Sequence, residues 1–294
     1  MCFGRSTVPE HKRNSSWCDA LTPIPENRQR WSLDSIDWQA ISSNPVRESE
    51  TLFYLVTAAS FIESTTDRYT ANLIAQFRGD NEITSWLEQQ WLPDEIQHGH
   101  ALRRYVQIVW PNFDWDRVYI SFLDEFSAHC GPGELEPTRT REMASRCVVE
   151  MGTASYYRTL SLISPDPVLA TIAGQIAHDE IRHYKHFYRY FRRFQKTEPE
   201  SRRSVSIALL NRLRMIDGQD SFIAMKHLYR NAHAGEPFNI RIYRNLRRRS
   251  RQLIEPHFPY RMCIQMLLKP LDLSPQVHRI ALPMAETLAR WVVP

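Results

Sequence analysis

The stretches Asp94-Glu95-Ile96-Gln97-His98 and Asp179-Glu180-Ile181-Arg182-His183 decide the fold expected for this chain. In each stretch a Glu and a His stand three residues apart, which on a helix places both side chains on one face, about one turn from each other. One metal ion could therefore contact both side chains. Either stretch alone would be weak evidence, because short matches of this kind arise by chance. The two together predict a pair of helices that face one site.

A single glutamate precedes each stretch on the preceding helical segment, Glu63 before the first and Glu150 before the second. Both lie among small and apolar residues, where an acid would be costly to bury without a partner. A cation supplies that partner, and four carboxylates with two imidazoles suit a pair of iron or manganese ions. We therefore expect the metal ligands to be Glu63, Glu95, His98, Glu150, Glu180 and His183.

The expected roles follow from charge and position. Four carboxylates balance the formal charge of two divalent ions, with Glu95 and Glu180 as bridging ligands and the other two glutamates as terminal ligands. Each histidine gives one nitrogen to one ion. Asp94 and Asp179 are expected to accept the outer imidazole N–H groups across the bundle, as the outer hydrogen-bond partners of metal ligands usually do.

The composition favours a mainly helical protein, because nine glycines in 294 residues are few and 43% of the residues are hydrophobic. Asn81 could cap the second helix, and Pro93 marks a kink or a restart inside it. A short crossover helix is expected at 114–129. Four long helices with a longer connection between the second and third are typical of a ferritin-like bundle. The expected long helices are Arg47–Phe77, Glu82–Val109, Thr138–Ile163 and Pro167–Phe194.

Three segments are expected along the chain. Residues 1–45 are rich in proline and polar residues, with Trp17, Trp31 and Trp38 as possible anchors, and are predicted to be an arm on the surface without a chemical role. Residues 46–196 form the bundle. Residues 197–294 are predicted to be a helical appendage packed on it, with helical patterns at 201–232, 239–254 and 276–291.

Other classes of protein are disfavoured by composition. The five cysteines are scattered and never spaced as Cys-x-x-Cys, so neither a disulfide framework nor a thiolate metal site is expected. The N-terminus lacks the apolar run of a signal peptide, and no stretch reaches the length of a membrane span. A cytoplasmic protein that does not act at a membrane is the prediction, and the net charge of +4 says little.

On these residues the chain resembles the soluble di-iron carboxylate proteins, and within them the acyl-carrier-protein desaturases. The run from Glu95 to Gly99 is similar to the first desaturase motif, including the glycine after the histidine, and the run from Asp179 to His183 is similar to the second. Thr153, one turn after Glu150, matches a threonine that the family links to oxygen handling. The resemblance covers about residues 50–195, whereas Pro93 and the segment after residue 200 depart from the family's pattern.

The resemblance implies an O2-activating non-haem di-iron oxidoreductase, a desaturase or an oxygenase. Its cofactor would be two iron ions, with manganese possible at one or both positions. Its substrate would be an acyl or amine-bearing small molecule, free or tethered to an acyl carrier protein. An electron donor such as ferredoxin and a homodimeric assembly are also implied.

Several alternatives stay open at this point. A third histidine ligand, for which His186 is the candidate, would favour a di-iron N-oxygenase of an amino group. A ferroxidase or iron-storage protein is a further alternative, although that class usually has shorter chains. A metal-free interaction module is the last. Tyr156 and Tyr157 could carry a radical, but packing in the core is the better interpretation.

Six arginines lie between residues 241 and 251 with no acid among them. They could be a solvated helix face or a docking site for an acidic partner, such as an acyl carrier protein. No nucleic-acid-binding motif accompanies them, so binding to nucleic acid is not expected. The arginines proposed to contact a partner are Arg244, Arg247, Arg248 and Arg249.

Overall fold

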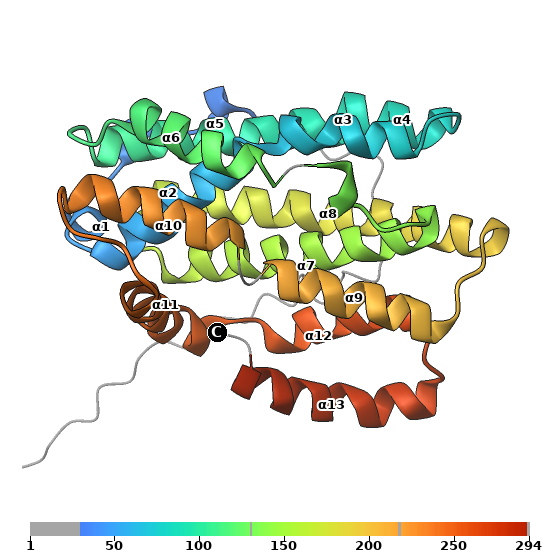
Figure 1. The fold of residues 1–294 in the computed structure, drawn as a ribbon. Helices are drawn as coiled ribbons and strands as arrows, with labels where there is room; N and C mark the ends of the chain where they lie inside the picture. Colours follow the sequence, from blue (N-terminus) through green and yellow to red (C-terminus); the bar gives the residue numbers. More distant parts are fainter. Residues whose placement is uncertain (1–29, 130, 217–218, 293–294) are drawn as a thin grey trace, which may run out of the picture.

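The computed structural model describes residues 30–129, 131–216 and 219–292, and Figure 1 shows them as a stack of long helices. Within these ranges the chain forms helices, turns and connecting segments but no β-strand, so the predicted all-α class is confirmed. None of the described helices is both long enough and apolar enough to cross a membrane.

Four long helices form the centre of the molecule. Helix α7 (Arg139–Ile163) packs along α8 (Pro167–Thr197), and α2 (Glu50–Glu63) packs against α5 (Leu92–Val109), which also contacts α8. Helix α6 (Trp115–Ser127) lies in the connection between α5 and α7. Asp114 is its N-cap, and the Asp114 side chain accepts the backbone N–H of Arg117. The bounds of α6, α7 and α8 agree with the predicted helices to within a few residues, whereas α2 and α5 are shorter than predicted.

Two apolar clusters divide these helices along their lengths. The first cluster includes Leu102 of α5, Leu160 of α7 and Ile176 of α8. The second includes Met143 of α7 and Phe187 of α8. Along α8, Glu180 and His183 lie between the residues of the first cluster and those of the second, whereas Glu150 of α7 lies among residues of the second cluster. Apolar packing around these helices therefore fixes the height at which the polar side chains meet.

The first long helix is interrupted, so the prediction of one helix over Arg47–Phe77 is wrong. It is divided into α1 (Ser43–Arg47), α2 and α3 (Thr66–Gln76), and the break between α2 and α3 directly follows Glu63. The hydroxyls of Ser64 and Thr65 donate to the carbonyls of Ser60 and Ile62, at 2.7 and 2.6 Å. Such bonds compete with the helical ladder and bend or end a helix.

The second predicted helix also has internal structure. Asp80, not Asn81, caps α4 (Asn81–Trp86), because its carboxylate accepts the backbone N–H of Ile83. A single π-helical segment, η4 (Leu87–Trp91), then leads into α5, where Pro93 lies in the first turn. The π-helical segment shifts the backbone hydrogen bonds just before Pro93, with the N–H of Leu92 bonded to the Leu87 carbonyl. Pro93 therefore lies where π-helical turns pass into α-helical turns of one continuous stretch, and not at the start of a separate helix.

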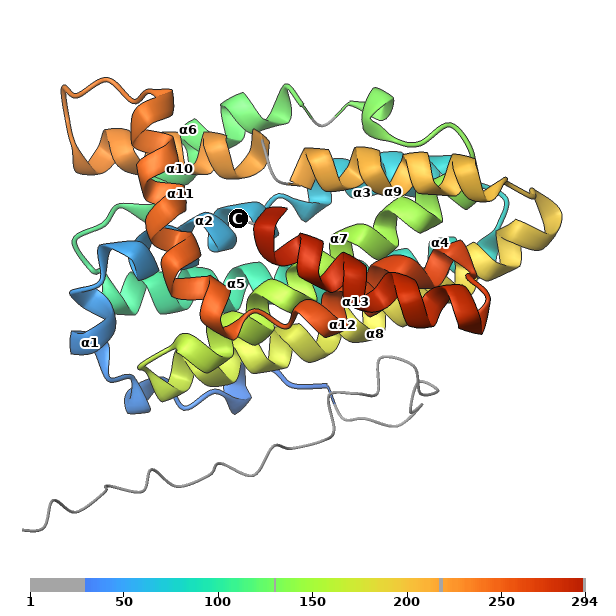
Figure 2. The ribbon, with the colours of Figure 1, turned by 90° about the horizontal axis from the view of Figure 1, so that it is seen from below.

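The described residues after 200 form five α-helices, which Figure 2 shows packed along the bundle. Helix α9 packs on α7, α10 packs on α2 and α6, and α12 packs on α7. Helix α12 had no counterpart among the predicted segments, and the predicted pattern at 201–232 is two helices. The five helices are α9 (Arg202–Ile216), α10 (Gln219–Ala232), α11 (Ile240–Ile254), α12 (Tyr260–Leu268) and α13 (Pro275–Val292).

The described end of the N-terminal arm, residues 30–42, contains two 3-10 turns, η2 (Leu33–Ser35) and η3 (Trp38–Ala40). Trp17 lies outside the described residues. Trp38 donates its indole N–H to the Leu33 carbonyl at 3.0 Å and carries the guanidinium of Arg104 over its ring, whereas Trp31 is buried. Both tryptophans therefore anchor the arm as predicted.

Gly99 lets α5 approach the end of α2. A Cβ added at Gly99 would lie 2.8 Å from the Ser64 hydroxyl, 3.1 Å from its backbone nitrogen and 3.2 Å from its Cα. Two of these atoms are backbone and cannot rotate away. Because Gly99 follows His98 and Ser64 follows Glu63, this contact brings the two polar side chains to the same level of the bundle.

We expect Gly99→Ala to destabilise the fold by about 1–3 kcal/mol, the usual cost of forcing a methyl group into a closely packed contact. Thermal unfolding followed by circular dichroism measures the change. The matched control is Gly174→Ala in α8, where the added Cβ would meet only the Ser161 hydroxyl at 3.3 Å. Equal melting temperatures for the two variants would contradict the close approach of α5 and α2.

Candidate metal centre

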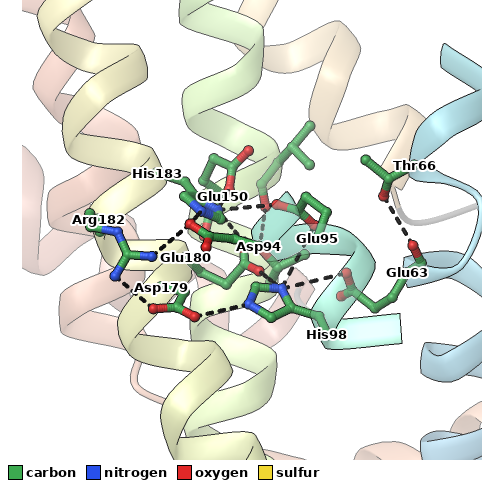
Figure 3. Close-up of polar contacts among 12 residues, drawn as sticks. Glu63, Thr66, Asp94, Glu95, His98, Glu150, Asp179, Glu180, Arg182 and His183 are labelled. Atoms are coloured by element: carbon green, nitrogen blue, oxygen red, sulfur yellow. Dashed lines mark hydrogen bonds and ion pairs between the residues drawn. The ribbon is translucent and has the colours of Figure 1, made fainter. Parts of the chain in front are cut away.

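The six predicted side chains converge in the middle of the bundle (Figure 3). They come from the end of α2, the first turns of α5, the middle of α7 and the middle of α8. They fall into two groups, each with ligand atoms within 4.8 Å of one another, and every member is buried. The groups are Glu63, Glu95, His98 and Glu180, and Glu95, Glu150, Glu180 and His183.

Glu95 and Glu180 belong to both groups, whereas each of the other four side chains belongs to one. This is the arrangement that two ions sharing two carboxylates would require. Each group thus offers three carboxylates and one imidazole, and each could hold a metal ion.

The two histidines are held in the same way from opposite helices. Nε2 of His98 in α5 donates to Oδ2 of Asp179 in α8 at 3.1 Å, and Nε2 of His183 in α8 donates to Oδ2 of Asp94 in α5 at 3.2 Å. Asp94 and Asp179 therefore lie where the sequence predicted them, opposite the histidine of the other helix. With the proton on Nε2, each ring directs the lone pair of Nδ1 into the cluster.

The Nδ1 atoms face carboxylate oxygens at short range. Nδ1 of His98 lies 3.2 Å from Oε1 of Glu180, and Nδ1 of His183 lies 3.1 Å from Oε1 of Glu95 and 3.5 Å from Oε2 of Glu150. Buried lone pairs that face each other are repulsive, and either a proton or a metal ion must lie between them. Four buried atoms at this point have no hydrogen-bond partner: His98 Nδ1, His183 Nδ1, Glu150 Oε2 and Glu180 Oε1. The donor set and its unpaired atoms therefore fit divalent cations.

The pKa values describe how the cluster behaves without a cation. Burial raises the pKa of Glu63 and Glu150 well above its ordinary value, and neighbouring carboxylates raise it further. Burial alone would lower the pKa of His98 and His183, but the surrounding carboxylates outweigh it and raise both values. Burial would likewise raise the pKa of Glu95, yet the two imidazoles lower it. Protons thus occupy the positions that cations would take.

Two residues of the outer network were not anticipated. Arg182 lies between the aspartates, with guanidinium nitrogens 2.7 Å from Asp179 and 2.8 Å from Asp94. Trp31 donates its indole N–H to Asp179 at 2.7 Å, and its ring stacks against His98. The arm therefore contacts the outer hydrogen-bond network of the site. Arg182 lies within the second motif and could have been found there, whereas nothing in the sequence near Trp31 indicates its contact.

Two hydroxyls contact the carboxylates directly. Thr153 donates to Oε2 of Glu180 at 2.7 Å, and Tyr157 donates to Oε1 of Glu63 at 2.6 Å. Tyr157 is buried in the first apolar cluster, while Tyr156 donates to the Leu55 carbonyl at 3.0 Å. The Thr153 hydroxyl thus fixes the orientation of Glu180, which belongs to both ligand groups, and the Tyr157 hydroxyl fixes that of Glu63, which belongs to one.

The other histidines near the site belong to neither group. His186 stacks on Trp86 with ring centroids 4.9 Å apart, and burial with nearby cationic side chains lowers its pKa to about 4. His178 contacts the Gly174 carbonyl through Nδ1 at 2.6 Å. Among the described residues, each group of candidate ligands therefore contains one histidine.

The chain matches no protein-family model, no curated protein and no solved structure.

We expect the purified chain to bind two Mn²⁺ or Fe²⁺ ions. A substitution in one ligand group should remove one ion, and a substitution of a residue shared by the two groups should remove both. Glu63→Ala and Glu150→Ala each damage one group and should leave about one ion per chain, whereas Glu180→Ala damages both groups and should leave none. Metal content after anaerobic desalting measures this. Glu88→Ala, at an exposed acid in η4, is the control and should retain both ions. Equal metal content in all variants would exclude the two-group site.

Metal binding should release protons, because the pKa values of Glu63, Glu150, His98 and His183 are raised in the metal-free chain and each group must give up its proton to bind metal. The affinity for Mn²⁺ should accordingly fall as the pH falls and rise as the pH rises. Calorimetric titrations in two buffers with different ionisation enthalpies measure the number of protons released. A binding heat that does not depend on the buffer would show that the ligands are already deprotonated.

Proposed function

We propose that this chain is an O2-dependent non-haem di-iron oxidoreductase with a ferritin-like four-helix bundle. The proposed reaction is desaturation or oxygenation of an acyl or amine-bearing small molecule. The observation that carries the proposal is the pair of buried ligand groups that share Glu95 and Glu180. Four carboxylates offset the charge of two divalent ions, and imidazole with carboxylate suits iron or manganese better than the softer metals. Two ferrous ions with open coordination positions would supply the electrons that reduce dioxygen.

The protein's own contribution is to hold the ligands and exclude water. Asp94 and Asp179 keep each imidazole in the tautomer that offers Nδ1. Tyr157 holds Glu63, and Thr153 holds Glu180, so neither carboxylate is free to turn away. The apolar clusters that surround the ligands give the site a low dielectric, which strengthens every electrostatic interaction within it.

An N-oxygenase acting on an amino group is the second candidate among enzymes, and a third histidine ligand would favour it. The stacking of His186 on Trp86 does not support that assignment. A ferroxidase or iron-storage protein is the third candidate. The five helices after residue 200 fit that class poorly, because its members usually have shorter chains. Size-exclusion chromatography would separate a 24-subunit shell from the proposed homodimer.

The proposed partners are an electron donor such as ferredoxin and, where the substrate is tethered, an acyl carrier protein. The arginines of α11 are the proposed docking surface for an acidic partner. Arg244 is exposed, Arg247 lies over the Tyr243 ring, Arg248 contacts Asn245, and Arg249 pairs with Glu50. Several of these arginines therefore have contacts within the chain.

Anaerobic loading with Fe²⁺ followed by a pulse of oxygen should consume O2 and give an absorption band in the near-ultraviolet or visible range. Glu95→Ala and Glu180→Ala should abolish both signals, because each removes a carboxylate common to the two groups. Glu88→Ala should retain them. Oxygen uptake that persists in the Glu95 and Glu180 variants would overturn the proposal, and so would iron-loaded wild-type protein that takes up no oxygen.

A further inference from the structure

A second polar site lies between the bundle and its C-terminal appendage. It is a cavity of about 200 Å³ with walls from α2, α3, α6, α7, α9 and α10. Two arginines line it, Arg146 of α7 and Arg212 of α9, and both are more than nine-tenths buried. Buried guanidinium groups are costly unless each is paired with an anion.

The two arginines share one carboxylate. Nε of Arg146 donates to Oε1 of Glu142 at 2.8 Å, while a terminal nitrogen of Arg212 lies 3.6 Å from Oε2 of the same glutamate. That second oxygen already accepts the backbone N–H of Glu136 at 2.8 Å. Arg212 also donates to the Glu134 carbonyl at 3.2 Å, but its Nε is buried with no hydrogen-bond partner. One buried donor, Nε of Arg212, is thus left without a partner at the cavity.

Asp220 of α10 is the acid that faces the cavity from the appendage. Burial raises its pKa, and neighbouring positive groups, His129 and Arg212, oppose that rise. In the part of the chain that the structure describes, neither cavity arginine forms an ion pair with it, since the ion pairs of both are with Glu142. Asp220 therefore does not replace the missing partner.

The cavity lies beside the candidate metal centre. Its apolar wall includes Ile62 and Val149, which directly precede Glu63 and Glu150 in sequence. Arg146 lies one turn before Glu150 on the same helix, about 6 Å along the helix axis at 1.5 Å per residue. The ring of Tyr69, another wall residue, lies under the Arg146 guanidinium.

We propose that this cavity binds the carboxylate of the molecule that is oxidised, with Arg146 and Arg212 as its anion partners, and that the substrate is a small carboxylic acid. This inference rests on the proposed function for the oxidation step, whereas the anion site itself does not. Arginine pairs with a carboxylate through two parallel hydrogen bonds, so the unpaired Nε of Arg212 is suited to such a ligand.

The volume of the cavity indicates which carboxylic acids fit it. A cavity of about 200 Å³ is smaller than the ~300–1,000 Å³ typical of pockets for drug-sized ligands, and equals about seven water molecules in the liquid. A short or aromatic acid fits this space, and a long acyl chain does not. The apolar side chains of Ile62 and Val149 would contact the body of such an acid.

The test compares acids with their uncharged amides. Calorimetric titration of the full-length chain with butyrate, benzoate, butyramide and benzamide should show each acid binding about tenfold or more tightly than its amide, the usual scale of a charge-assisted hydrogen bond. Arg212→Gln should weaken benzoate binding by a similar factor and leave benzamide unchanged. Arg203→Gln, at an exposed arginine of the same helix, is the matched control and should bind benzoate as the wild type does.

Equal affinity of benzoate and benzamide for the wild type would overturn the inference, without reliance on any variant. Binding of none of the acids at millimolar concentrations would also overturn it. Arg212→Lys, which retains the charge but not the paired donors, should bind benzoate more tightly than Arg212→Gln if the variants fold.

The connection to the metal centre has its own measurement. Nuclear magnetic resonance should show that Mn²⁺ in the centre broadens the proton signals of bound benzoate in Mn²⁺-loaded protein, relative to metal-free protein. Unbroadened benzoate that binds tightly would overturn its assignment as a substrate analogue. Failure of the chain to bind Mn²⁺ at all would overturn the proposed function, while acid binding to metal-free protein would still measure the anion site. The two failures are therefore distinguishable.

Discussion

The structure depends on four buried carboxylates that face two imidazole nitrogens in the middle of a helical bundle. Such a cluster is unfavourable unless cations or protons lie within it. The helices must therefore bring their acids to one level, and the packing of the two apolar clusters holds them there. The contact between Gly99 and Ser64 sets the same level for α2 and α5.

The six candidate ligands could be predicted because their signal is local. Glu and His three residues apart can be recognised on any helix, and an acid within an apolar stretch indicates a buried partner. Most helix ends were also predictable, since Asp114 and Thr138 are capping residues that precede helical patterns. The break after Glu63 was not anticipated, because serine and threonine hydroxyls can bond to backbone carbonyls within a helix as well as at its end, so their presence alone does not predict a break.

The remaining features depend on contacts between distant parts of the chain. Trp31 and Asp179 are 148 residues apart, and no local pattern marks a tryptophan in a polar arm as a hydrogen-bond donor to a buried aspartate. The sequence likewise predicts Arg212 only as a residue of an amphipathic helix. Its contact with Glu142 depends on the packing of α9 on α7. Helix α12 is short and lies between Pro259 and Pro270, so the sequence pattern did not predict a helix there. Periodicity thus identifies which residues are buried but not which distant partners they contact.

The helix break after Glu63 places residues of one junction in both the metal centre and the cavity that the C-terminal helices cover. Because α2 ends at Glu63 and α3 starts at Thr66, this junction contributes Glu63 to the metal centre and Ile62 and Thr65 to the cavity. Helices α9 and α10 then cover the cavity and bring Arg212 into it. A bundle without them would leave Arg146 and Glu142 as an ordinary ion pair facing solvent. The segment after residue 200 therefore adds a second buried guanidinium with an unpartnered donor to a structural ion pair, next to the carboxylates that could hold metal.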